Sequence, residues 1–152
     1  MLILNSPKNL LKVVLDTSVF IAAFLSPSPQ SSSAQIIAAW RRNEFTLIMA
    51  PQLLEELIIK LLRKNIPNSE IEILIKTIVY TGIHIPGIYS ATKLDNIDPN
   101  DNMFLAATYE SGADYLVSLD KKHLLPLKYY HGTQIVTPDL FLRVLSNYSN
   151  SI

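Results

Sequence analysis

The chain has 152 residues, of which 49% are hydrophobic and 17% charged, as is typical of one compact globular domain. It contains no cysteine, which excludes disulfides and thiolate chemistry and favours a reducing compartment. Thirteen basic and 13 acidic residues give zero net charge, so any nucleic-acid partner must be held locally or through metal ions rather than by a basic excess.

We expect a single α/β domain over residues 1–152, with a core from about residue 11 to about residue 146. The opening apolar stretch, at 1–4, is shorter than the hydrophobic region of a signal peptide, and no uninterrupted apolar run could span a bilayer. A cytoplasmic protein is therefore expected.

Apolar runs alternate with amphipathic segments in the first half of the chain. We predict a strand at 11–15, a helix at 18–25, a Ser/Pro-rich loop at 26–33, a helix at 34–42, a strand at 46–50 and a helix at 51–64. The first strand is an unbroken run rich in β-branched residues, which is typical of a parallel strand buried on both faces. Pro51 suits the first position of its helix.

The same alternation continues in the second half. We predict a helix from 67 to about 80, a strand at 83–85, a helix at 101–111, strands at 114–118 and 134–137, and a final helix at 138–145. Alternating strands and helices indicate parallel strands joined by crossover helices. The predicted fold is therefore a three-layer α/β/α sandwich around a mostly parallel sheet.

Asp16 follows the first predicted strand directly, and Thr17 and Ser18 come next at the start of a helix. The hydroxyl residues suit the N-cap of that helix. Ligands of open α/β sheets bind at the carboxyl ends of the strands, so Asp16 is a candidate for chemistry. The alternative is that Asp16 only caps the helix.

Three more acids lie at comparable places. Asp120 follows a later strand, and Asp101 begins a helix, where the helix dipole favours its charge. Glu56 lies at the edge of the apolar stripe of its helix and Glu55 lies further toward solvent, so Glu56 is the better candidate. Each acid also has a structural alternative: Asp101 as a helix N-terminal charge, Glu56 as the partner of Lys60, and Asp120 as a turn former.

These acids lie within four motifs. The motifs are Val-Val-Leu-Asp-Thr-Ser at 13–18, Ala-Pro-Gln-Leu-Leu-Glu-Glu-Leu at 50–57, Asp-Pro-Asn-Asp-Asn-Met-Phe-Leu-Ala-Ala at 98–107 and Gly-Ala-Asp-Tyr-Leu-Val-Ser-Leu-Asp at 112–120. Together they resemble the PIN domain, a family of Mg²⁺- or Mn²⁺-dependent nucleases that includes the VapC-type toxins of toxin–antitoxin pairs. The last two motifs, at their mutual spacing, are the most specific. A closing Ile-Val-Thr-Pro-Asp-Leu-Phe-Leu at 135–142 is similar to the end of the bacterial and archaeal members.

The resemblance implies which residues form the site. The catalytic residues and metal ligands would be Asp16, Glu56, Asp101 and Asp120. The residues around these ligands would be Thr17, Ser118 and Asp98. One departure is Ser18, where many members of the family carry Asn.

The resemblance also implies an activity and partners. The protein would be a metal-dependent endoribonuclease that hydrolyses single-stranded RNA, the toxin of a toxin–antitoxin pair, with an antitoxin protein as partner and a homodimeric assembly. Ligands that are all oxygen atoms select hard ions, which favours Mg²⁺ or Mn²⁺ over zinc. Two such ions can activate a water molecule and stabilise the leaving oxygen of a phosphodiester.

Two alternatives come from other classes of protein. One is a non-catalytic PIN-like module that binds RNA or another protein. The other is a phosphotransferase of the haloacid-dehalogenase type, which usually carries a second Asp two residues after its nucleophile, where this chain has Ser18.

The remaining polar and apolar features are interpreted structurally. His84, His123 and His131 show no metal-ligand spacing and are expected in loops or on the surface. Basic residues at 41, 42, 60, 63 and 64 would form either a basic rim or solvated helix faces. An apolar stripe that includes Val79 is expected in the core, whereas Ile73 lies off that stripe and indicates a partner surface.

Overall fold

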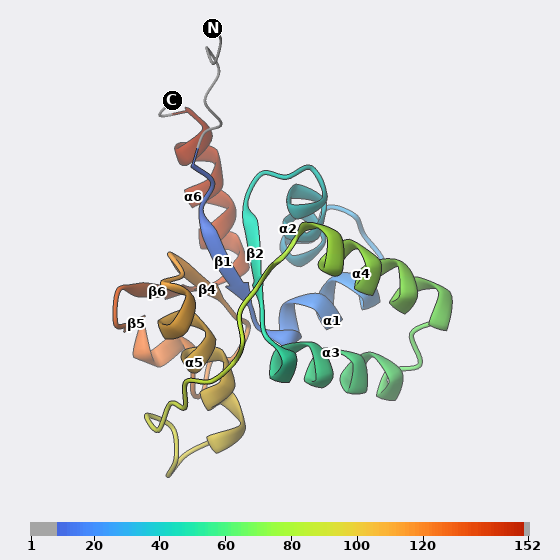
Figure 1. The fold of residues 1–152 in the computed structure, drawn as a ribbon. Coiled ribbons are helices and arrows are strands. Elements are labelled where there is room, and N and C mark those ends of the chain that lie inside the picture. Colours follow the sequence, from blue (N-terminus) through green and yellow to red (C-terminus); the bar gives the residue numbers. More distant parts are fainter. Residues whose placement is uncertain (1–8, 151–152) are drawn as a thin grey trace, which may run out of the picture.

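Six strands form one sheet in the order β3-β2-β1-β4-β6-β5 (Figure 1). The strands are β1 (Lys12–Leu15), β2 (Thr46–Met49), β3 (Ile83–His84), β4 (Tyr115–Val117), β5 (Tyr129–Tyr130) and β6 (Thr133–Val136). In this order each neighbouring pair from β3 through β2, β1 and β4 to β6 is parallel, and the last pair, β6 with β5, is antiparallel. The computed structural model describes residues 9–150, so the expectation for residues 1–4 lies outside the described residues.

Helices cover the sheet and extend beyond one of its edges. They are α1 (Thr17–Leu25), α2 (Ser32–Arg41), α3 (Pro51–Arg63), α4 (Asn68–Thr81), α5 (Asn102–Ser111) and α6 (Pro138–Asn150), with short 3₁₀ helices η1 (Pro99–Asp101) and η2 (Leu125–Leu127). Figure 1 shows α5 on the near side of the sheet, α6 on the far side, and α1 to α4 grouped beside β2. The predicted α/β/α fold with a mostly parallel sheet is confirmed.

Burial on both faces fixes the central strand. Val13 and Val14 point to opposite faces of β1, and both are fully buried. Burial of one such side chain stabilises the fold by about 1.5–3 kcal/mol, and a slip of one residue would exchange the two faces. The register of β1 against β4, with Leu15 opposite Val117, therefore fixes where the chain emerges at Asp16.

The sheet is bordered by a hairpin that the sequence pattern did not predict. Strand β5 turns into β6 through His131 and Gly132, which have φ angles of 46° and 92°. Two consecutive positive φ angles suit a two-residue hairpin connection, and glycine adopts such an angle without a steric cost. The sheet therefore ends in one antiparallel pair.

The end of the last helix and the burial of Val79 differ from what was expected. Helix α6 runs to Asn150 rather than ending at Leu145. Val79 was expected in the core, but its side chain is 54% exposed near the end of α4. Ile73 on the same helix is exposed as predicted. Across the described residues, no helix has the length and apolar character required to cross a membrane.

Candidate active site

Strands β1 and β4 end side by side and bring Asp16 next to Ser118. The two strands pair in parallel up to Leu15 and Val117, and the Asp16 backbone N–H donates to the Val117 carbonyl at 2.9 Å. Asp16 comes directly after β1, and Ser118 comes directly after β4. The carboxyl edge of the sheet, where α/β proteins bind ligands, is therefore where the sequence predicted the acids to meet.

Asp16 is held by a network of hydroxyl groups. Its Oδ2 atom accepts hydrogen bonds from Ser118 Oγ at 2.6 Å and from Ser18 Oγ at 3.0 Å. Its Oδ1 atom accepts from the Ser18 backbone N–H at 3.3 Å, so Asp16 itself is the N-cap of α1. The expectation that a hydroxyl residue caps this helix is wrong, because the carboxylate takes that place and the hydroxyls orient it.

Burial raises the pKa of Asp16. Only 6% of the residue is exposed, and loss of hydration disfavours the charged carboxylate. The hydrogen bonds from Ser118 and Ser18 act in the opposite direction, and the nearby charge of Asp120 adds to the increase. Asp16 is therefore a buried acid whose charged form a neighbouring positive charge would stabilise.

Asp101 and Asp98 approach the same point from the 3₁₀ turn that precedes α5. Asp101 is the N-cap residue of α5, but its side chain forms no capping hydrogen bond. Burial, a hydrogen bond with the Asp120 carboxyl, and the charges of Asp16 and Asp98 raise the pKa of Asp101 to about 8. Interaction with the helix dipole does not by itself explain the position of Asp101, because its carboxyl group faces other acids rather than the free amides of the helix.

Asp120 arrives from the turn after β4. Its carboxylate accepts hydrogen bonds from the backbone amides of Lys122, His123 and Leu124 at 3.0–3.3 Å, so the predicted turn-forming role is present. Burial acts to raise the pKa of Asp120, but the hydrogen bonds from Asp101 and from these three amides outweigh burial and lower it. Asp101 and Asp120 therefore differ in character: Asp101 tends to keep its proton, and Asp120 tends to stay ionised and to accept the hydrogen bond from Asp101.

Helix α3 supplies the fourth acid. Glu56 lines a cavity of about 520 Å³ together with the other acids, whereas Glu55 is exposed elsewhere on the helix. Glu56 also forms the predicted pair with Lys60, whose Nζ atom lies 3.8 Å from its carboxylate. The polar and charged residues lining the cavity are Asp16, Thr17, Ser18, Glu56, Lys60, Lys64, Asp98, Asp101, Asp120 and His123. The structure thus brings the four predicted acids to one cavity.

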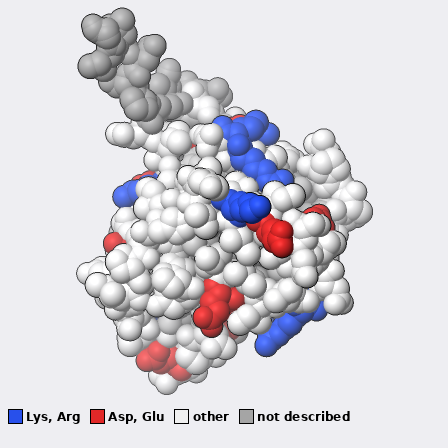
Figure 2. Space-filling model, turned by 45° about the vertical axis from the view of Figure 1, so that its right-hand side comes forward, with Lys and Arg blue, Asp and Glu red and all other residues white. Residues whose placement is uncertain are grey.

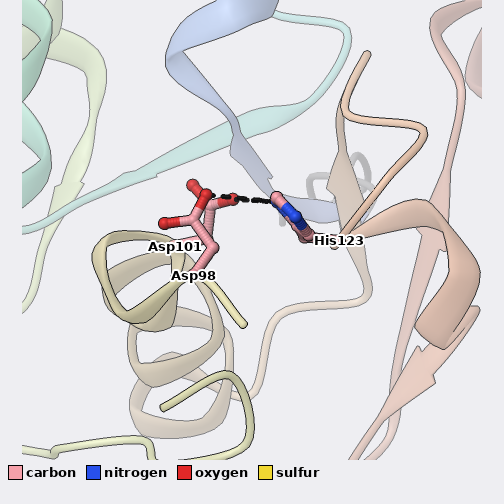
Figure 3. Close-up of side chains that lie close together, drawn as sticks. All are labelled: Asp98, Asp101 and His123. Carbon is pink, nitrogen blue, oxygen red and sulfur yellow. Dashed lines mark ion pairs between the residues drawn. The ribbon is translucent and has the colours of Figure 1, made fainter. Parts of the chain in front are cut away.

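His123 lies among these acids, which the sequence interpretation missed. Figure 3 shows its ring pointing toward the carboxylates of Asp98 and Asp101. His123 Nδ1 lies 3.2 Å from Asp98 Oδ2, 3.9 Å from Asp101 Oδ2 and 3.7 Å from Asp120 Oδ2. Its position three residues after Asp120 in a turn was the available signal, because the amides of that turn bind Asp120 and orient the following side chains.

The other predicted polar residues lie elsewhere. His131 contacts the rings of Tyr109 and Tyr130, and His84 contacts the Ile78 carbonyl, so neither joins the acids. Arg42 pairs with Glu44 rather than lining this cavity. Lys60 and Lys64 are the members of the expected basic rim that reach the cavity.

Divalent cations suit this set of donors. Within residues 9–150, no lysine or arginine forms an ion pair with Asp16, Asp101 or Asp120, and the raised pKa of two of these acids reflects burial and mutual repulsion. Carboxylate oxygens are the ligands that Mg²⁺ and Mn²⁺ accept in proteins. Asp98, Asp101 and His123 each offer one possible ligand atom, and these three atoms lie within 4.8 Å of one another. The residues therefore fit a metal ion of this class.

Basic groups do not dominate the face of the molecule that Figure 2 presents. On the face that Figure 2 presents, lysine and arginine side chains occur in small groups between acidic ones and broad uncharged areas. A polyanion on this face would meet local positive charges rather than a continuous basic band. This agrees with the zero net charge of the chain.

Comparison with known protein families identifies the family of this chain. The family model for the PIN domain matches residues 12–122, a segment that begins at β1 and includes Asp16, Glu56, Asp101 and Asp120. A comparison with curated proteins found no match. The resemblance to PIN domains is thereby confirmed, and the VapC-type subgroup stays a prediction. Because the match covers most of the 152 residues, the chain belongs to the PIN domain family.

Proposed function

We propose that this protein is a metal-dependent endoribonuclease that hydrolyses phosphodiester bonds of single-stranded RNA at the acidic cavity. PIN domains are in general metal-dependent nucleases, and the match supports a nuclease-like function. The observation that carries the proposal is the meeting of Asp16, Asp101 and Asp120 from three separate segments, without a lysine or arginine partner among the described residues. Acids gathered in this way repel one another unless cations lie between them.

The four acids take different roles in the proposal. Asp16 and Asp101 are the main metal ligands, because they are the acids whose charged forms are most disfavoured without a cation. Glu56 and Asp120 complete the site or orient water. A bound divalent ion supplies charge neutralisation and a nucleophilic water at neutral pH.

Neighbouring residues hold these acids in place. Ser118 and Ser18 donate hydrogen bonds to Asp16 and fix the direction of its carboxylate. Thr17 lines the same cavity, and Lys60 and Lys64 stand where an approaching phosphate would meet a positive charge. Asp120 is oriented by three backbone amides, so its carboxylate keeps one position.

Cleavage of labelled single-stranded RNA tests this function. With Mn²⁺ or Mg²⁺ we expect fragments with 5′-phosphate and 3′-hydroxyl ends, because a metal-activated water attacks without help from the 2′-hydroxyl. EDTA should abolish cleavage. Products with cyclic 2′,3′-phosphates would contradict the mechanism, and RNA that is bound but left intact in both metals would indicate a non-catalytic binding module.

We further propose that the protein is the toxin component of a toxin–antitoxin pair, acts in the cytoplasm and forms a homodimer. The proposal is supported by the motifs at 98–107 and 112–120, which resemble the PIN domain family that includes the VapC-type toxins, and by the closing motif at 135–142, which is similar to the end of its bacterial and archaeal members. Expression alone should arrest bacterial growth, and co-expression of a small neighbouring open reading frame should relieve that arrest. Growth that is unaffected by expression of a protein that cleaves RNA in vitro would contradict the toxin role and leave the nuclease role intact.

The phosphotransferase alternative finds little support in the site. Where that class usually has a second Asp, this chain has Ser18, whose hydroxyl donates to Asp16 and accepts from the Leu119 backbone N–H. Ser18 is therefore committed to holding the loop rather than to proton transfer. The PIN domain match also opposes this alternative.

A further inference from the structure

His123 is placed against the acids by the turn that Asp120 organises. The His123 backbone N–H donates to Asp120 Oδ1 at 3.2 Å, and the side chain is 28% exposed. Figure 3 shows the Asp98 and Asp101 carboxyl groups on one side and the imidazole on the other, with the ring nitrogen facing them. A histidine in this position faces the inside of the cavity rather than bulk solvent.

The spacing of these groups matches that of metal ligands. An octahedral ion with ligands at about 2.1 Å places neighbouring ligand atoms about 3.0 Å apart and opposite ones about 4.2 Å apart. His123 Nδ1 lies 3.2 Å from Asp98 Oδ2 and 3.9 Å from Asp101 Oδ2, between those two limits. One ligand atom from each residue falls within 4.8 Å of the others, so a small contraction would complete the arrangement.

An imidazole ligand changes which ion the site prefers. Mg²⁺ favours oxygen ligands and gives up water reluctantly. Transition-metal ions accept imidazole nitrogen more readily, and their affinity for nitrogen-containing sites rises from Mn²⁺ along the series. A site with two carboxylates and one imidazole is therefore biased toward a transition-metal ion.

We propose that Asp98, Asp101 and His123 form a binding position for a divalent transition-metal ion, with His123 Nδ1 as a direct ligand, and that this position selects Mn²⁺ over Mg²⁺. The proposal deepens the nuclease function and rests on it. It makes Asp98 a metal ligand rather than a residue around the ligands. The competing hypothesis is that the His123 side chain pairs with the acids in place of a metal ion and does not bind one.

Electron paramagnetic resonance of the Mn²⁺-loaded protein tests direct ligation. We expect electron spin-echo modulation from one ¹⁴N nucleus in the unaltered protein, which requires no variant to fold. The signal should persist in His131→Asn, a control that alters a histidine outside the cavity and suits its positive φ angle. It should disappear in His123→Ala, and Asp98→Asn should weaken Mn²⁺ binding while keeping the nitrogen signal.

Binding constants for Mn²⁺ and for competing Mg²⁺ provide the second readout. We expect the ratio of Mn²⁺ to Mg²⁺ affinity to fall by about tenfold or more in His123→Ala and to stay unchanged in His131→Asn. Bound Mn²⁺ without nitrogen coupling, an unchanged ratio, or tighter Mn²⁺ binding in His123→Ala would overturn the proposal, as would the absence of Mn²⁺ binding. Failure of the nuclease function would look different: nitrogen-coupled Mn²⁺ with no cleavage of RNA in any divalent metal.

Discussion

Glu55 and Glu56 are neighbouring identical acids that the fold treats differently. Glu56 lines the acidic cavity with a side chain that is 24% exposed, and Glu55 faces solvent. We expect Glu56→Gln to lower the rate of Mn²⁺-dependent RNA cleavage about 10- to 100-fold, because a ligand or water-orienting group is lost. Glu55→Gln should leave that rate unchanged.

Both Glu variants should remain folded, which makes them a matched pair. The Glu56–Lys60 contact at 3.8 Å is partly exposed, and such pairs contribute about 0–1 kcal/mol. Urea melts should therefore agree with the unaltered protein within about that margin. Equal losses of activity in the two variants would show that Glu56 has no special role.

Single residues also show where the sequence was informative. Asp16 was interpreted either as a helix cap or as a site residue, and the structure shows that one carboxylate caps α1 and faces the cavity. These alternatives were not exclusive, because the helix begins at the strand end where ligands bind. His123 was missed because its partners lie 22 and 25 residues earlier at Asp101 and Asp98, with no regular spacing between them.

At the scale of elements, Ser118 joins the ends of β1 and β4. Its hydroxyl donates to Asp16 Oδ2 at 2.6 Å and accepts from the Asp120 backbone N–H at 2.9 Å, and the residue is fully buried. Ser118→Ala leaves the partly buried Asp120 amide and the buried Asp16 carboxylate each short of one partner. We expect a loss of about 1–3 kcal/mol in urea melts and about 10- to 100-fold weaker Mn²⁺ binding.

Ser118→Thr provides the control for that prediction, since threonine keeps the hydroxyl. It should retain part of the Mn²⁺ affinity if the hydrogen bond to Asp16 is what matters. If Ser118→Ala binds Mn²⁺ as tightly as the unaltered protein, the hydroxyl does not orient Asp16 for a metal ion. Stability and metal affinity are measured on the same samples, so an unfolded variant would be recognised directly.

Elements with a strong apolar period were predictable, and short ones were not. The strand at β1 and the helix begun by Pro51 follow from their patterns within one residue at each end. Strand β5 has only two residues, and its hairpin turns through His131-Gly132 rather than one of the common Asn-Gly or Asp-Gly pairs. Its pairing with β6 depends on tertiary contacts that no local pattern indicates.

For the whole molecule, the shifted acids make stability depend on pH. Burial, hydrogen bonding with Asp120 and neighbouring charges raise the pKa of Asp101 to about 8, whereas it titrates near 4 in the unfolded chain. Between these values the folded state binds more protons, so the free energy of unfolding falls as pH rises. Asp120, whose pKa is lowered, contributes stability above its unfolded pKa and loses it only in more acidic solution.

In EDTA, we therefore expect urea melts to show decreasing stability from about pH 5 to about pH 8.5. Asp101→Asn should reduce that decline, because one of the two acids with a raised pKa is gone, and Asp16 should maintain the remainder. Saturating Mn²⁺ should oppose the decline as well, since an ion that binds only the folded state adds stability and favours the ionised acids. A decline of equal size in Asp101→Asn would assign the pH dependence to other groups.

The measurement that tests the central claim most directly pairs RNA cleavage in Mn²⁺ with urea melts in EDTA for the unaltered protein and Asp16→Asn. Asparagine keeps an oxygen acceptor for the Ser18 and Ser118 hydroxyls and removes a buried charge, at the cost of the 3.3 Å capping bond. We predict no detectable cleavage and metal-free stability within about 1 kcal/mol of the unaltered protein, or above it. A variant that loses more than about 2 kcal/mol and still cleaves RNA would contradict the account, because Asp16 would then serve the fold and not the reaction.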